Sequence, residues 1–267
     1  MRMGLYYSGG LDWTFKDSII RDFTTLYEAI PQTPDYVTYA DAHWHELIDR
    51  YQPSILWNDI GYPAAANLPE LFARFYNTVA DGVINDRFIQ HPSQLNAATQ
   101  ETPTPTNTHF DYRTPEYTSY DQIMDIKWES TRGVGHSFGY NQTEGPEHHI
   151  PIDKLICLFV DIVSKNGNLL LNVGPMADGT IPDLQRERLE GLGAWLAVNG
   201  DAIFETHPWI TADGRTTDGI DVRYTQKGDV LYATHLHTPH SKQVSIEGLI
   251  ADPATKVQLL GSQLPLD

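Results

Sequence analysis

The chain has 267 residues, of which 40% are hydrophobic, and this is enough apolar material for one large domain or two smaller ones. Thirty-five acidic residues against 18 basic ones give a formal net charge of −17. That charge argues against a nucleic acid or an anionic membrane as partner, since both bind positive protein surfaces. The single cysteine, Cys157, excludes an internal disulfide and lies in an apolar run, where we expect a small buried side chain.

No apolar run approaches the ~20 residues that a membrane-spanning helix needs. No signal peptide is visible before the first predicted strand either. We therefore expect no membrane partner and favour a cytoplasmic location.

Strand patterns alternate with helical patterns over the first 200 residues. The predicted strands are Gly4–Ser8, Ser54–Asp59, Asp81–Arg87, Met124–Ser130, Gly133–Tyr140 and Asn168–Pro175. The predicted helices are Val37–Tyr51, Leu68–Ala80, Asp153–Gly167 and Thr180–Gly200. The polar stretch 91–117, rich in Pro and Thr, is too long for a structural turn and indicates a functional loop.

The end of the chain has a different pattern, in which polar and apolar residues alternate between short turns. The expected turns lie at Asp213–Gly214, Lys227–Gly228 and Asp252–Pro253, and they predict an antiparallel sheet. We therefore expect a domain boundary near Ala202, with an α/β domain over 1–202 and a small β domain over 203–267.

Alternating strands and helices predict a parallel sheet covered by helices. The first domain offers about five such units, whereas a closed eight-unit barrel needs about 250 residues. The sequence alone therefore leaves two architectures open, an open doubly wound sheet and an incomplete barrel.

Acidic residues stand at the carboxyl ends of the predicted strands, where functional side chains collect in parallel α/β folds. Asp59 ends the second strand, and Asp86 with Arg87 ends the third. Two acids flanked by aromatic rings are what the cleavage of a glycosidic bond requires, since one acid attacks the sugar and the other protonates the departing oxygen. The aromatic residues beside these acids include Trp57 and Tyr117, whose rings could stack on a sugar.

Six phrases, in order, resemble family 29 glycoside hydrolases, the retaining α-L-fucosidases. They are "GLYYSGGLDW", "LWNDIGYP", "INDR", "TPEY", "KWESTRGVGHSFGYN" and "GNLLLNVGPMADGTIPDLQRERLEGLGAWLAVNGDAIF". The resemblance runs from about Gly4 to Trp209, and the region after it is similar to the C-terminal β-sandwich of that family.

The resemblance implies an α-L-fucosidase that hydrolyses terminal α-L-fucose with retention, without a cofactor, and that can also transfer fucose. It implies that Asp59 is the nucleophile and Glu116 the general acid/base, with Glu129 as the alternative acid/base used in other branches of the family. Tyr6, Trp57, Arg87 and Phe138 match positions that line the fucose pocket.

The residues agree with these roles on physical grounds. Asp59 ends a rigid strand, so packing can hold it in place for attack, and Arg87 at the next strand end can hold a sugar hydroxyl or stabilise a carboxylate. Glu116 lies on a loop, where partial desolvation can keep a carboxylic acid protonated near neutral pH.

The barrel of the family begins well before the point that matches Gly4, and the sandwich continues beyond the match. The resemblance thus implies an incomplete TIM-like barrel followed by a shortened β-sandwich. Because an open barrel leaves apolar edges uncovered, we expect a homo-oligomer. The alternative function is a carbohydrate-binding remnant with little or no turnover, and a weaker third is a structural module completed by a partner.

The histidines do not predict a metal site. His43 and His45 are two residues apart and so point to different faces of a helix, and the H-E-x-x-H spacing is missing. We expect no metal, and the substrate we expect is a fucosylated oligosaccharide or glycoside.

Overall fold

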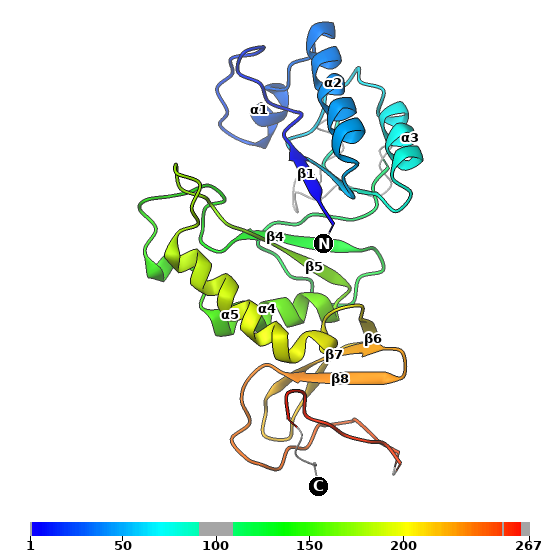
Figure 1. The fold of residues 1–267 in the computed structure, drawn as a ribbon, viewed down its shortest axis with the longest axis vertical. Helices are drawn as coiled ribbons and strands as arrows, with labels where there is room; N and C mark the ends of the chain where they lie inside the picture. The colour runs from blue at the N-terminus through cyan, green and yellow to red at the C-terminus, as the bar shows by residue number, and fades with distance from the viewer. Residues whose placement is uncertain (1, 91–108, 253, 263–267) are drawn as a thin grey trace. The chain divides into compact units, whose positions relative to one another are not determined.

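The computed structural model describes residues 2–90, 109–252 and 254–262 (Figure 1). The chain forms two compact units, Met1–Pro115 and Glu116–Asp267, and each is described by itself. Most of the stretch predicted as a functional loop, 91–117, lies outside the described residues. The predicted boundary near Ala202 stays a prediction.

The first unit contains a parallel three-stranded sheet in the order β1-β2-β3. Its strands are β1 (Gly4–Tyr7), β2 (Ile55–Asn58) and β3 (Val83–Ile84). The register places Tyr6 beside Trp57 and Leu56 beside Ile84. Strand β3 ends at Ile84 and is shorter than predicted. Beyond Ile84, β2 and β3 are joined by hydrogen bonds between the Asn85 side chain and the Asn58 backbone.

Three helices accompany this sheet (Figure 1): α1 (Phe23–Glu28), α2 (Pro34–Tyr51) and α3 (Leu68–Thr78). Thr33 and Asn67 cap the two longer helices, as their side-chain oxygens accept hydrogen bonds from Tyr36 and Glu70 respectively. Helix α1 was not predicted, because its six residues are too few to show an apolar period. A capping box between Asp22 and Thr25 stabilises it.

An aromatic core fixes the ends of β2 and β3 against α2 and α3. Phe88 follows β3, is fully buried and packs against Trp44 of α2 and Phe72 of α3, with ring centroids 5.7 and 5.0 Å away. Leu56 and Ile84, in register on the two strands, are also fully buried. Close packing therefore anchors β2 and β3 and the chain just beyond β3.

The second unit begins with a parallel pair, β4 (Trp128–Gly133) and β5 (Gly167–Asn172). Helix α4 (Ile152–Ser164) packs against β5 and against α5 (Asp183–Asn199). Two short 3₁₀ helices, η2 (Pro146–His148) and η3 (Gly200–Ala202), complete this part. The parallel pairing and both long helices confirm the predicted α/β pattern.

The prediction of a strand over Gly133–Tyr140 is wrong beyond Gly133. That segment is a series of bends. The amides of His136 and Ser137 bond to the carboxylate of Glu144, so they are not available for a strand ladder.

An antiparallel sheet follows, with β6 (His207–Arg215), β7 (Asp221–Lys227) and β8 (Val230–His235) in that order. The predicted turn at Lys227–Gly228 is confirmed, and Gly228 adopts a positive φ of 55° there. The turn predicted at Asp213–Gly214 is wrong, because these residues pair with β7. The chain reverses at 216–220, where the Thr216 hydroxyl bonds to Asp218 and to the amide of Ile220.

No strand forms over 242–249 or 256–262 in the part of the chain that the structure describes, apart from one bridge between Thr216 and Ile246. Among the same described residues, no helix is both long and apolar enough to cross a membrane.

A cluster of buried charges joins α4 to the antiparallel sheet. The carboxylate of Asp161 accepts hydrogen bonds from Lys165 Nζ at 2.8 Å, Arg223 Nε at 2.6 Å and Ser119 Oγ at 2.7 Å. Burial alone would raise the pKa of Asp161, but the bonds from Lys165, Ser119 and Arg223 outweigh it and hold the pKa below its usual value.

We predict that this cluster makes the second unit acid-sensitive. The folded-state pKa of Asp161 lies below its unfolded-state value of about 3.9. The contribution of Asp161 to the free energy of unfolding is therefore fully present above the unfolded-state pKa, and it is lost as the pH falls through the folded-state pKa. Asp161→Asn should lower the free energy of unfolding at pH 7 by about 3–5 kcal/mol, because Lys165 then stays buried without its counter-charge, while Arg223 keeps its pairing with Asp213 at 3.1 Å.

Urea unfolding of both proteins at pH 7 and at decreasing pH measures these effects. Asp49→Asn is the control, because the Asp49–Arg74 pair is about half exposed and should contribute less than about 1 kcal/mol. An Asp161→Asn protein as stable as the control would contradict the prediction.

Candidate active site

Asp59 comes directly after β2, at the carboxyl end of the parallel sheet of the first unit. The neighbouring Asn58 is fully buried and links two strand ends: its Nδ2 donates to the carbonyls of Gly61 and Arg87, both at 2.9 Å. Asn85, at the end of β3, accepts from the Asn58 amide and donates to the Asn58 carbonyl. These bonds hold Asp59 and Arg87 on adjacent strand ends.

The turn after Asp59 is held in a rare backbone conformation. Ile60, a β-branched residue, has a φ of +58°, and Gly61 follows with +76°. A Cβ on Gly10, in the turn that ends β1, would lie only 1.9 Å from the carbonyl oxygen of Ile60. Close packing therefore maintains the strain, and such strain concentrates at functional sites.

Three donors fix the carboxylate of Asp59. Tyr6 Oη donates to Oδ2 at 2.8 Å, whereas Arg87 Nη1 and the Ile60 amide both donate to Oδ1 at 2.9 Å. The side chains of Asp59 and Arg87 are 19% and 17% exposed, so the ion pair is only partly shielded and can be reached by a ligand.

Aromatic groups surround the same carboxylate. The rings of Tyr6 and Trp57 stack with centroids 5.4 Å apart, and the guanidinium of Arg87 lies 4.7 Å from the Trp57 centroid. Desolvation of the phenol and the adjacent Asp59 carboxylate raise the pKa of Tyr6, so its hydroxyl stays protonated at neutral pH and donates to Asp59. Four predicted site residues, Tyr6, Trp57, Asp59 and Arg87, thus lie together.

Arg87 is anchored on its far side by Thr114. Arg87 Nε donates to the Thr114 hydroxyl at 2.8 Å, and Nη2 donates to the Thr114 carbonyl at 2.7 Å. The same hydroxyl donates to Asp86 at 2.7 Å. Burial raises the pKa of Asp86, while the Thr114 bond and Arg87 oppose the rise. Thr114 therefore connects Asp86 to the guanidinium that holds Asp59.

Nothing in the sequence alone marked Asn58, Asn85 or Thr114 as parts of the site. The repeated Asn–Asp pairs, Asn58–Asp59 and Asn85–Asp86, are the signal that could have found the two asparagines. Thr114 carries no such signal, because its bonds to Asp86 and Arg87 span 28 and 27 residues respectively.

The predicted acid/base, Glu116, opens the second unit and is exposed. Its backbone bridges to Thr131 of β4, and the Tyr117 amide donates to the Thr131 carbonyl at 3.0 Å. The Tyr117 hydroxyl accepts from the Gly133 amide and donates to the His136 carbonyl. The segment with Glu116 is thus attached along β4, and Glu116 itself is an exposed residue.

The alternative acid, Glu129, lies within β4 and is only 9% exposed. A general acid must reach the oxygen of a bound substrate, so exposure favours Glu116. Phe138, the last predicted site residue, is 38% exposed and packs against Tyr117 with centroids 5.5 Å apart. Glu116, Glu129 and Phe138 therefore belong to the same unit.

His43 is engaged in other contacts. His43 Nδ1 lies 2.9 Å from the Tyr7 hydroxyl, and the His43 ring packs on Tyr39. Over residues 2–90, 109–252 and 254–262, no three His, Cys, Asp or Glu side chains gather in a way that could hold a metal ion.

The carboxylate of Asp59 is held rigidly at a strand end, beside the aromatic rings of Tyr6 and Trp57. Such a carboxylate can attack a carbon centre, while the stacked Tyr6 and Trp57 and the Arg87 guanidinium offer apolar and hydrogen-bonding surface to a sugar. An exposed acid on a separate segment, Glu116, is suited to proton transfer.

The family model described as alpha-L-fucosidase matches residues 1–201. The alpha-L-fucosidase of Branchiostoma floridae is 30% identical over 278 residues, which is 100% of this chain and 57% of that protein. The solved structure of the Thermotoga maritima alpha-fucosidase with a mechanism-based inhibitor has a TM-score of 0.83 and 44% identity, covering 94% of this chain and 55% of that chain. Its complex with fucose has a TM-score of 0.81 and 43% identity, with 95% and 55% covered. The chain therefore spans about half the length of the relatives it matches.

We predict that the Thr114 hydroxyl stabilises the first unit, because it bonds to both Asp86 and Arg87. Thr114→Val keeps the shape but removes the hydroxyl, and it should lower the free energy of unfolding by about 1–3 kcal/mol. Thr114→Ser keeps the hydroxyl and should recover most of that loss.

Urea unfolding of the three proteins checks this order. Thr38→Val is the matched control, because the Thr38 hydroxyl is exposed on α2 and bonds only to the Pro34 carbonyl there. The prediction fails if the serine variant is as unstable as the valine variant, or if both match the control.

Proposed function

This chain belongs to the alpha-L-fucosidase family, and on that basis we propose that it hydrolyses terminal α-L-fucose from fucosylated oligosaccharides or glycosides. The observation that carries the proposal is the fixed carboxylate of Asp59, bonded to Tyr6 and Arg87 beside the ring of Trp57. The same chemistry supports transfer of fucose to another sugar when an acceptor hydroxyl replaces water.

In the proposed first step, Asp59 attacks the anomeric carbon of fucose, and the bond from that carbon to the leaving oxygen breaks. Glu116, in its acid form, gives its proton to the departing oxygen. Tyr6 and Arg87 hold the carboxylate in line, so little reorganisation is needed when the glycosyl–Asp59 ester forms.

In the second step, Glu116 is a carboxylate and removes a proton from water, whose oxygen attacks the anomeric carbon. The ester bond to Asp59 breaks, and fucose leaves with its original anomeric configuration. A retaining mechanism of this kind needs the two carboxyl groups about 5–5.5 Å apart. Glu129 is the alternative acid/base in the proposal.

An incomplete TIM-like (β/α) barrel with a shortened C-terminal β-sandwich is the proposed architecture. The likeness to fucosidase structures and the parallel β1-β2-β3 and β4-β5 pairings support it. The homo-oligomeric state and the cytoplasmic location stay predictions.

We predict that Asp59→Ala reduces the release of 4-nitrophenol from 4-nitrophenyl α-L-fucoside by about 10³-fold or more, because no covalent intermediate can form. Azide should restore turnover and give β-L-fucosyl azide, since it attacks from the face that Asp59 leaves empty.

Asp35→Ala is the control for this experiment, because Asp35 is exposed in the first turn of α2 and should leave turnover unchanged. Undiminished turnover by the Asp59 variant would remove the assignment. Fucose binding by a wild-type protein that releases no product would favour the carbohydrate-binding remnant instead.

We predict that Glu116→Ala and Glu129→Gln separate the two candidate acids. Loss of the acid/base should reduce turnover of a fucoside with a poor leaving group by about 10²–10⁴-fold and remove the alkaline limb of the pH–rate profile. Glu116→Ala should show both effects, and Glu129→Gln neither. The reverse pattern would assign the role to Glu129.

A further inference from the structure

The proposed mechanism gives no role to Asp86 and Thr114, which lie next to Arg87 in the first unit. Thr114 is only 5% exposed. Its amide and hydroxyl donate to Asp86 Oδ1 at 3.1 and 2.7 Å, and its hydroxyl and carbonyl oxygens accept from Arg87 Nε and Nη2 at 2.8 and 2.7 Å. Every polar atom of Thr114 therefore takes part in joining Asp86 to Arg87.

The bonds of the Thr114 hydroxyl have a fixed direction. A hydroxyl carries one hydrogen and two lone pairs, and an arginine N–H can only donate to it. The hydroxyl hydrogen therefore goes to Asp86, and a lone pair on the same oxygen is left for Arg87 Nε. Asp86 thus sets the orientation in which the hydroxyl receives the guanidinium.

The bonds to Thr114 also fix where Arg87 points. A guanidinium is planar, so hydrogen bonds at two of its nitrogens determine the direction of the third. Thr114 holds Nε and Nη2, and the Trp57 ring centroid lies 4.7 Å from the guanidinium carbon. Nη1 then donates to Asp59 Oδ1 at 2.9 Å. The position of that carboxylate oxygen therefore depends on a residue outside the ion pair.

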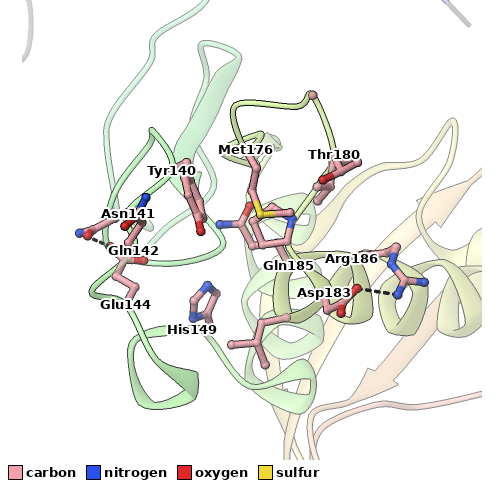
Figure 2. A pocket seen from close by; sticks show the side chains of 14 residues that line it. Tyr140, Asn141, Gln142, Glu144, His149, Met176, Thr180, Asp183, Gln185 and Arg186 are labelled. Atoms are coloured by element: carbon pink, nitrogen blue, oxygen red, sulfur yellow. Dashed lines mark hydrogen bonds and ion pairs between the residues drawn. The ribbon is translucent and has the colours of Figure 1, made fainter.

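Arg186, which lines a pocket of the second unit, is an arginine without such support (Figure 2). Its Nη2 donates to Asp183 at 2.8 Å and its Nη1 to Glu190 at 3.2 Å, but no hydrogen bond from Nε is found in the part of the chain that the structure describes. The Arg186 side chain is 56% exposed, against 17% for Arg87. An exposed pair of this kind does not hold one geometry firmly in water.

Nucleophilic attack depends on accurate placement, because a misplacement of about 1 Å can lower a rate by about 10²-fold. We propose, resting on the function proposed above, that Asp86 and Thr114 are positioning residues for the nucleophile. Asp86 orients the Thr114 hydroxyl, and Thr114 fixes the guanidinium that holds Asp59. Both residues act through Arg87, and neither contacts the reacting atoms.

Steady-state kinetics with 4-nitrophenyl α-L-fucoside separate positioning from binding. Thr114→Val should lower kcat by about 10- to 100-fold and leave KM within about 3-fold, because the carboxylate is displaced while the contacts to the sugar stay. Thr114→Ser keeps the hydroxyl and should keep kcat within about 3-fold of wild type. Asp86→Ala should resemble Thr114→Val, whereas Asp86→Asn retains an oxygen that accepts from Thr114 and should resemble wild type.

The double variant Asp86→Ala/Thr114→Val tests whether the two residues act in series. If Asp86 acts through the Thr114 hydroxyl, the double variant should be at most about 3-fold slower than Thr114→Val alone. Losses that multiply would overturn the proposal, and so would a Thr114→Ser protein as slow as Thr114→Val. If Asp86→Ala does not fold, the comparison of the valine and serine variants decides.

Ile48→Val is the control for a purely structural effect. Ile48 is a fully buried residue of α2, so its truncation destabilises the same unit through packing alone. This variant should keep kcat within about 2-fold of wild type. A fall in kcat equal to that of Thr114→Val would assign the effect to loss of stability and overturn the positioning role.

Hydrogen exchange of the Arg87 Nε–H tests the same contacts without turnover. Heteronuclear NMR of the wild type should show a protected Nε–H signal that Arg87→Lys removes, that Thr114→Ser keeps and that Thr114→Val loses. The exposed Arg186 Nε–H should exchange fast in each protein. If the wild type turns over no fucoside, the proposed function fails, and this signal decides whether Thr114 fixes the guanidinium. An Arg87 Nε–H that exchanges as fast as that of Arg186 would overturn the inference.

Discussion

Opposite charges that are partly removed from water stabilise a fold only when further hydrogen bonds satisfy them, and this constraint shapes the strand ends of the first unit. Arg87 Nη1 lies 2.9 Å from Asp59 Oδ1, and both side chains are less than one-fifth exposed. Tyr6 and the Ile60 amide complete the bonding of the carboxylate, and Thr114 completes that of the guanidinium. The turn at Ile60, with its positive φ, and the close packing of Gly10 against it lie directly beside these groups.

The two units divide the proposed chemistry between them. The first supplies a rigid carboxylate at the end of a buried strand. The second carries Glu116, the proposed acid/base, on an exposed segment that is attached along β4 by backbone hydrogen bonds. Thr114 stands two residues before Glu116 in the chain, so the residue that anchors Arg87 also leads directly into the acid segment.

The sequence predicted the elements that have a clear apolar period and the site residues that stand at their ends. The buried stripe of α2, with Trp44 and Ile48, and the apolar strand before Asp59 are examples. It did not predict α1, which is stabilised by a capping box and is too short to show an apolar period. It also did not predict the bends after Gly133, where the Glu144 carboxylate accepts hydrogen bonds from backbone amides that a strand would need. Long-range partners such as Thr114 were also missed, because a hydrogen bond across 27 residues leaves no local pattern. The roles of Asp59 and Glu116 came from family resemblance and remain proposals.

Covalent labelling of the nucleophile tests the central claim most directly. The protein is treated with 2-deoxy-2-fluoro-α-L-fucosyl fluoride, which forms the glycosyl ester but releases it slowly, and its peptides are sequenced by mass spectrometry. The account predicts one fluorofucosyl group, attached to Asp59. A label on another residue, or turnover of a fucoside by a protein that never becomes labelled, would contradict it.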